Sequence, residues 1–146
     1  MSTINTISQL KAAYPYQFTK KTYELSLTHG WLSIFVKLCG DVDALLIAQG
    51  KGNHGFHWTQ IKEKFGTARF SFGAKKSARP LIAELTITAA NSTCDVCICC
   101  GRPGGEDTYN EYVLTLCEQH KADRHAGLPL KIWIDSDDEV ALGDGP

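Results

Sequence analysis

The stretch CDVCICCGRPGGEDTYNEYVLTLCEQH, residues 94–120, holds five of the six cysteines of this 146-residue chain. Two pairs of metal-binding residue types stand in it at short spacing: Cys97 with Cys100, and Cys117 with His120. The first pair is directly followed by glycine, and such a tight turn directs backbone amides at the thiolate sulfurs and stabilises their charge. The sixteen residues between the pairs are enough for a hairpin that brings the pairs together.

The second pair is expected at the start of a helix. The segment YVLTLC (112–117) is typical of a strand, and EQHKADRH (118–125) of a short helix. A cysteine and a histidine three residues apart on a first helical turn point the same way, which suits a tetrahedral site. The spacing therefore predicts a Cys3His zinc site formed by Cys97, Cys100, Cys117 and His120. Catalytic zinc keeps one position for water, so four protein ligands indicate a structural zinc.

Other assignments of the ligands remain open from the sequence. Cys94 and Cys97 also form a CxxC, and Cys99 lies inside the proposed pair, although neither alternative pair ends with glycine. His125 is a second candidate for the histidine ligand at a less suitable spacing. The interpretation without metal is a set of free buried thiols or a local disulfide.

The remaining composition indicates one globular domain in a reducing compartment. The N-terminus lacks the charged start and apolar core of a secretory signal, and no apolar run reaches the ~18 residues of a membrane span. We therefore expect a cytoplasmic protein with no membrane contact, in which clustered cysteines bind metal more often than they form disulfides. We expect a zinc-stabilised α+β domain over residues 1–134 and an acidic C-terminal tail over residues 135–146.

Hydrophobic periodicity predicts the elements of this domain. N-terminal helices are expected over 8–13 and 31–46, the second of them split at Gly40-Asp41 with Asp41 as a cap. A central antiparallel hairpin is predicted over 56–73, turning near 64–66. Further predictions are a helix over 77–90 with Pro80 in its first turn and Leu81, Ile82 and Leu85 on one side, and a short strand over 130–134. The cysteine segment is predicted to form a treble-clef-like zinc knuckle.

Two separated motifs resemble a known group of sequences. The segment IKEKFGTARFSF (61–72), followed by CICCGRPGG and TLCEQH, is similar to a family of small, largely uncharacterised phage and prophage proteins. That family shows a KEKFGxLRF-like hairpin, then CxxCGxPG and TLCxxH, and the upstream YP (14–15) and GW (30–31) also resemble it. The chain departs from the pattern at Ala68, where leucine is usual, and in its extra cysteines. The resemblance implies a phage or mobile-element origin and the same zinc ligands. It supplies no established activity that could be carried over to this chain.

Catalytic signatures are missing from the sequence. There is no Walker loop, no GxSxG and no deaminase signature. A nuclease of the zinc-stabilised HNH type needs a histidine base beside a second histidine or asparagine that binds metal. With His120 assigned to zinc, only His125 and Asp123 remain nearby, and they do not make up this set. His54 and His57 near Glu63 are more simply loop and strand residues. We therefore expect a protein that is not an enzyme.

Charge offers two candidate binding surfaces. Residues 1–79 carry 11 Lys and Arg against 4 Asp and Glu, and residues 80–146 carry 4 against 12. One surface is a basic hairpin with interleaved aromatics, which suits nucleic acid; its positive residues are Lys62, Lys64, Arg69, Lys75, Lys76 and Arg79. The other is the acidic cluster Asp135, Asp137, Asp138 and Glu139. The simpler interpretation is that the two halves neutralise each other and that the hairpin aromatics face the core.

The sequence favours a non-catalytic accessory protein of a phage or prophage that binds and modulates a host protein. Counter-defence, such as inhibition of a CRISPR or restriction system, is the form we expect, because acidic surfaces can occupy basic nucleic-acid grooves by charge complementarity. The alternative function is direct nucleic-acid binding through residues 62–79.

Overall fold

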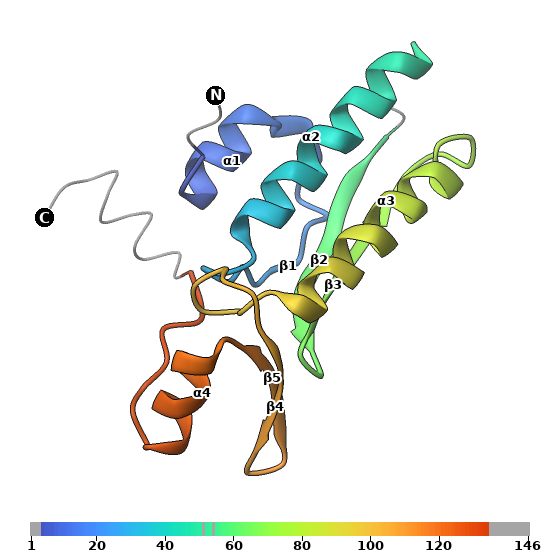
Figure 1. Ribbon diagram of the computed structural model, residues 1–146. Coiled ribbons are helices and arrows are strands. Elements are labelled where there is room, and N and C mark those ends of the chain that lie inside the picture. Colours follow the sequence, from blue (N-terminus) through green and yellow to red (C-terminus); the bar gives the residue numbers. More distant parts are fainter. Residues whose placement is uncertain (1–3, 51, 54, 135–146) are drawn as a thin grey trace, which may run out of the picture.

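The computed structural model describes residues 4–50, 52–53 and 55–134 of the chain. These residues form a mixed α+β structure, as the sequence predicts (Figure 1). The helices are α1 (Ile7–Ala13), α2 (Leu32–Gln49), α3 (Arg79–Ser92) and α4 (Glu118–His125), with short 3-10 turns η1 (Pro15–Gln17) and η2 (Thr93–Asp95). The strands are β1 (Glu24–Leu25), β2 (His57–Lys64), β3 (Thr67–Gly73), β4 (Gly105–Tyr109) and β5 (Tyr112–Leu116).

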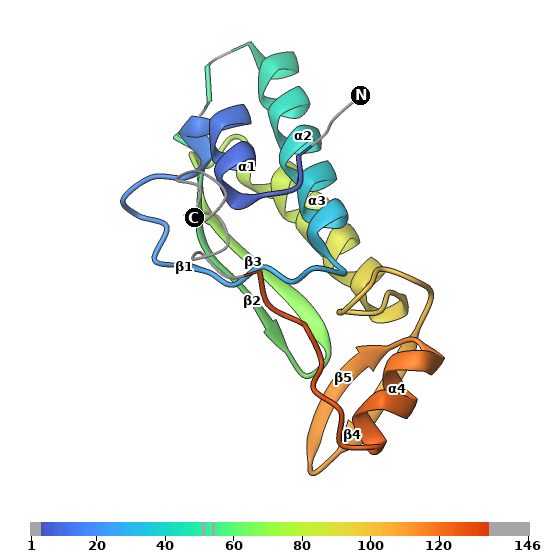
Figure 2. The ribbon, with the colours of Figure 1, turned by 90° about the vertical axis from the view of Figure 1, so that its left-hand side faces the viewer.

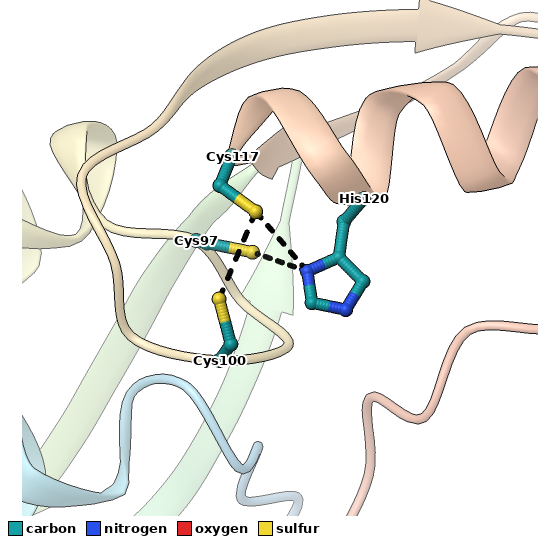
Figure 3. Close-up of side chains that lie close together, drawn as sticks. All are labelled: Cys97, Cys100, Cys117 and His120. Carbon is teal, nitrogen blue, oxygen red and sulfur yellow. Dashed lines mark hydrogen bonds between the residues drawn. The ribbon is translucent and has the colours of Figure 1, made fainter.

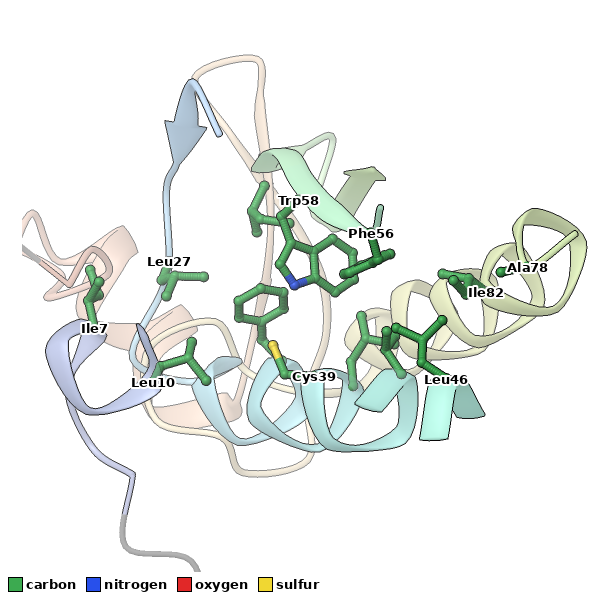
Figure 4. Close-up of a cluster of buried hydrophobic side chains, with 13 residues drawn as sticks. Ile7, Leu10, Leu27, Cys39, Leu46, Phe56, Trp58, Ala78 and Ile82 are labelled. Carbon is green, nitrogen blue, oxygen red and sulfur yellow. The ribbon is translucent and has the colours of Figure 1, made fainter. Parts of the chain in front are cut away.

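The larger part of the molecule is a three-stranded sheet with helices on one side. Strand β2 is central, parallel to β1 and antiparallel to β3. The sheet's apolar face packs on α2, where the Phe35 ring lies 5.2 Å from that of Trp58 and 5.6 Å from that of Phe70. Figure 4 shows Trp58 of this core together with Cys39 and Leu46 of α2. Buried Trp58 donates its indole N–H to Gln17 over 3.0 Å, which satisfies that N–H and the side-chain oxygen of the buried Gln17.

Helix α2 corrects one prediction, because it runs without a break through Gly40-Asp41. Its buried residues Phe35, Leu38, Cys39, Val42 and Leu46 form one continuous stripe across that point. Asp41 does not cap a second helix but forms an ion pair with Lys37 one turn earlier, at 2.6 Å. Packing of the stripe outweighs the modest helix penalty of a single glycine, about 1 kcal/mol.

The β2–β3 hairpin and α3 agree with prediction in most respects. The turn is made by Phe65 and Gly66, both with positive φ, and Pro80 lies in the first turn of α3. Phe70 and Phe72 pack against the buried core, as the simpler interpretation of the hairpin holds, whereas Phe65 in the turn contradicts it because its side chain is exposed. Leu81 does not share the buried side of α3 with Ile82, because it is exposed.

The smaller part of the molecule is a C-terminal unit that holds the cysteines (Figure 2). It consists of the turn at residues 96–103, the β4–β5 hairpin and α4. The predicted strand over 130–134 is reduced to a single bridge between Trp133 and Thr28, with backbone hydrogen bonds on either side. The predicted tail, 135–146, lies outside the described residues.

Candidate metal centre

Three cysteines and a histidine converge at the base of α4 (Figure 3). The Nδ1 atom of His120 lies 3.2 Å from the Sγ of Cys117 and 3.4 Å from that of Cys97. The Sγ atoms of Cys100 and Cys117 are 3.7 Å apart, and all four ligand atoms lie within 4.8 Å of one another. These four residues are the set that the sequence spacing selects, and together they could hold a metal ion.

The first two ligands are presented by a tight turn closed by its own backbone. Cys97 donates its N–H to the Arg102 carbonyl over 2.8 Å, and Gly101, at φ 81°, donates to the Cys97 carbonyl over 3.0 Å. Burial raises the pKa of the Cys97 thiol, but amides of Cys117, Cys100 and Cys99 hydrogen-bond to its sulfur and lower the pKa below its ordinary value. The turn therefore favours the thiolate that a metal requires.

The other two ligands come from the first turn of α4. Cys117 is the N-cap residue, and His120 follows three residues later. Burial raises the pKa of the Cys117 thiol, but hydrogen bonds with the backbone and side chain of His120 and with Cys100 together lower it more, so the net shift of the pKa is downward. The pKa of Cys100 is raised, by burial first and then by the neighbouring thiols. Negative sulfurs this close together repel one another, and a bound cation removes that repulsion.

The extra cysteines lie outside this cluster. Cys99 is buried, and burial with the charge of neighbouring Cys97 raises its pKa to about 12, which keeps it a neutral thiol. Cys94 is exposed. His125 is directed elsewhere, with its Nε2 3.0 Å from Asp107. Among the residues that the structure describes, no second group of this kind is found.

The cysteine turn is fixed to the larger part of the molecule by Gly30 and Trp31. Gly30 donates its N–H to the Ile98 carbonyl over 2.8 Å, and the Trp31 indole donates to the Val96 carbonyl over 2.8 Å. A Cβ on Gly30 would overlap the carbonyl oxygen of Cys97, so only glycine allows this approach. In the sequence, this GW pair is marked only by its resemblance to phage proteins, which assigns it no physical role.

A second set of contacts joins the two hairpins. The Thr115 hydroxyl on β5 donates to the Gly66 carbonyl over 2.6 Å, and Ile98 donates its N–H to the Thr115 carbonyl over 2.9 Å. Behind them lies a buried cluster shared by both parts: Trp31, Ala68, Cys97, Ile98, Cys99, Leu114, Leu116 and Cys117. Two of the four proposed ligands are thus also core residues.

Helix α4 is held on the β4–β5 hairpin by an ion-pair network. Arg124 donates to the Asp107 carboxylate over 2.9 Å and to the carbonyls of Asp107 and Tyr112 over 2.8 Å. The side chains of Arg124 and Asp107 are only 10% and 12% exposed. Sequence reasoning missed this pair, because the two residues lie on different elements and carry no spacing signal.

The basic residues of the hairpin do not form one group. Lys62 and Arg69 are cross-strand partners, and with Lys64 they occupy the sheet face opposite the buried Ile61 and the partly buried Phe70. Lys75, Lys76 and Arg79 come after the far end of β3. The acidic candidates Asp135, Asp137, Asp138 and Glu139 lie outside the described residues.

The histidines near the hairpin do not assemble with Glu63. His57 opens β2 and its Nδ1 lies 3.0 Å from the Gly55 carbonyl oxygen, whereas Glu63 is near the other end of that strand. Six residue steps along the strand separate them by about 20 Å. Glu63 instead accepts the N–H of Gly66 over 2.7 Å and shapes the turn. His54 lies outside the described residues.

Comparison of the chain with models of protein families, with curated proteins and with solved structures finds no match. Within the described part of the chain, no helix is both long and apolar enough to cross a membrane.

Proposed function

We propose that the Cys3His cluster binds zinc and that the zinc is structural. The observation that carries this proposal is the spacing of the ligand atoms. A tetrahedral zinc with Zn–S about 2.3 Å and Zn–N about 2.0 Å places sulfurs about 3.8 Å apart and sulfur about 3.5 Å from nitrogen. The contacts of 3.7, 3.4 and 3.2 Å match these edges within a few tenths of an ångström.

The ligand types and their number support the same proposal. Thiolate and imidazole in a tetrahedron suit zinc rather than magnesium or calcium, which prefer oxygen. Four protein ligands leave no coordination position for water or substrate. The order of cysteine turn, β-hairpin and ligand-bearing helix supports a treble-clef-like unit, in which zinc fixes α4 against the turn at residues 96–103.

The function that these features support best is non-catalytic binding of a partner protein. A closed metal shell removes the metal as a catalyst, and His57 and Glu63 do not form a site. The resemblance of residues 61–72 and the cysteine motifs to phage proteins supports a host protein as the partner. Counter-defence, through inhibition of a CRISPR or restriction nuclease, remains the proposed form of this function.

The direct test is capture of a partner from lysate of candidate host cells by the immobilised, zinc-loaded protein. A specific, stoichiometric host protein whose activity changes on binding is the expected result. Recovery of nucleic acid alone, or turnover of DNA in the presence of divalent metal, would contradict the proposal.

One observation favours nucleic-acid binding as a second function. Lys62, Lys64 and Arg69 share the face of the sheet that α2 does not cover, where they can reach phosphates. Base stacking through Phe70 and Phe72 is excluded because both rings pack on the core. The test is DNA binding across a salt series, for the wild type and for Lys62→Ser/Lys64→Ser/Arg69→Ser. Lys20→Ser/Lys21→Ser serves as a control for lost surface charge. Tight, salt-sensitive binding that only the first variant loses would replace the partner-protein proposal.

A further inference from the structure

The tip of the β2–β3 hairpin lies against strand β5 of the second hairpin, and a groove opens between them. Both ribbon views place the β2–β3 turn next to β5 (Figure 1 and Figure 2), and Gly66 and Thr115 are in contact there. The groove has a volume of about 260 Å³. It is lined by Glu63, Lys64 and Phe65 from one hairpin and by Glu111, Tyr112 and Val113 from the other.

Two aromatic side chains of this groove are exposed to solvent. Phe65 is 70% exposed and Tyr112 is 66% exposed. The geometry of the turn does not account for a phenylalanine at position 65. Its φ of 53° is unfavourable for a bulky residue, and Asn-Gly is the preferred pair in such a turn. Exposed aromatics in a concave surface are the usual anchors of protein recognition.

The charge of the groove selects the class of ligand. Glu63 and Glu111 outnumber Lys64, so the lining carries a net negative charge. The ammonium of Lys64 lies 5.7 Å from the centre of the Phe65 ring, which places a cation against this aromatic side chain. Carboxylates beside aromatic rings attract a guanidinium or ammonium group and repel a phosphate.

We propose that this groove binds an arginine or lysine side chain on a basic segment of the partner protein. The side chain lies between Phe65 and Tyr112 and stacks its charged group on their rings, while Glu111 provides the counter-charge. Arginine suits the site better than lysine because its planar guanidinium stacks on aromatic faces. This inference rests on the proposed function, since it names the surface and the chemistry by which a partner protein is recognised.

The test uses the full-length zinc-loaded protein and a defined probe, a short acetylated and amidated alanine peptide with one central arginine. Its control is the same peptide with citrulline, which keeps the shape but lacks the charge. In amide NMR spectra, the arginine peptide is expected to shift saturably the resonances of Phe65, Gly66, Glu111, Tyr112 and Val113. The citrulline peptide is expected to leave them in place.

Two variants remove the groove chemistry without harming the fold. Phe65→Asn and Glu111→Asn place a residue that tolerates positive φ at positions with φ of 53° and 65°. Each is expected to weaken peptide binding about tenfold, equivalent to about 1.4 kcal/mol. Matched controls are Ile87→Ala, which removes an exposed apolar side chain on α3, and Glu118→Gln, which removes an exposed carboxylate on α4. Both controls should bind as the wild type does.

The outcomes separate this inference from the proposed function. Equal shifts by the citrulline peptide, binding unaffected by Phe65→Asn, or saturable shifts of the same residues by single-stranded DNA would overturn the groove assignment. If host capture succeeds and is unchanged in both groove variants, the groove fails while the proposed function stands. If the arginine peptide binds as expected but no host protein is captured, the groove stands and the proposed function fails.

Discussion

At the scale of single residues, Gly30 determines how closely the cysteine turn packs on the larger part of the molecule. Its backbone N–H bonds to Ile98, and a Cβ there would overlap the Cys97 carbonyl oxygen, a backbone atom that cannot move without displacing a ligand. Gly30→Ala is therefore expected to lower the free energy of unfolding by about 3 kcal/mol, at the upper end of the usual overpacking range. Denaturant unfolding measures this loss.

Gly40 provides the matched control. It lies inside α2, where a Cβ would meet only the flexible end of Tyr14, at 3.1 Å. Gly40→Ala is expected to change the unfolding free energy by less than about 1 kcal/mol, because the gain in helix propensity offsets the small contact. Equal effects of the two substitutions would show that Gly30 does not act through its contact with the cysteine turn.

Asp107 gives the protein a pH-dependent stability. Burial raises the pKa of its carboxyl, but the hydrogen bonds and positive charges of Arg124 and His125 lower the pKa by a larger amount. The pKa of Asp107 in the folded protein therefore lies below its ordinary value. A carboxyl with a lowered folded pKa contributes stability above its unfolded pKa of about 3.9, and the contribution is lost as pH falls through the folded pKa. The free energy of unfolding of the wild type is therefore expected to be higher than that of the Asp107→Asn variant, and the difference should be largest above about pH 5.

Urea unfolding of the two proteins across pH measures this difference. The stability advantage of the wild type should shrink steadily below about pH 4. Asp123→Asn is the control, since Asp123 accepts a hydrogen bond from neutral Gln119 over 2.9 Å. A wild-type advantage that does not change between acid and neutral pH would contradict the role of the Asp107 charge.

At the scale of elements, the sequence was informative wherever a short-range pattern decides the structure. Hydrophobic periodicity predicts the β2–β3 hairpin, and the segment EQHKADRH, which follows a strand-like segment, predicts α4. The prediction of a helix break at Gly40-Asp41 was wrong, because it considered the local effect of the glycine and not the buried stripe of α2. That stripe packs against residues distant in the sequence, such as Trp58, and its burial decides the helix.

In the candidate site, too, some features follow from short-range sequence patterns and others depend on contacts between distant segments. The four candidate ligands follow from their spacing, whereas Cys94, Cys99 and His125, which the sequence leaves open as alternatives, are set aside by their three-dimensional position. The docking of Gly30 on Ile98 and of Thr115 on Gly66 depends on contacts between segments far apart in the chain. Nothing in the local sequence of either segment indicates its partner.

Arg124 fixes α4 to the β4–β5 hairpin, and its loss tests that connection. Arg124→Ala leaves the nearly buried Asp107 carboxylate without its closest cation and two carbonyls without a donor. We expect the unfolding free energy to fall by about 3 kcal/mol, as is usual when one partner of a buried ion pair is removed. Lys121→Ala on the same helix removes only a surface ion pair with Glu118.

Chemical unfolding of the two variants provides the comparison. The Lys121→Ala protein is expected to remain within about 0.5 kcal/mol of the wild type. A similarly small effect of Arg124→Ala would mean that the metal centre alone positions α4.

At the scale of the whole molecule, the Cys3His cluster and the second buried cluster form one structural unit. Cys97 and Cys117 belong to both, and Trp31 and Ala68 extend the cluster into the larger part of the protein. Structural zinc contributes folding energy directly, on the order of 10 kcal/mol in small zinc peptides. Removal of the proposed zinc is therefore expected to loosen the C-terminal unit and the groove between the β2–β3 tip and β5, while the core around Phe35 and Trp58 is affected less.

The most direct test of a structural zinc in the Cys3His cluster combines two measurements on the purified protein. Atomic emission gives its zinc content, and calorimetry follows its thermal unfolding. We predict one zinc per chain in the wild type and in Cys94→Ser, and none in Cys100→Ser, whose unfolding temperature should match that of the chelated wild type. A wild-type protein that is fully folded without metal and whose melting does not respond to added zinc would contradict the central claim. So would loss of zinc from Cys94→Ser with retention in Cys100→Ser.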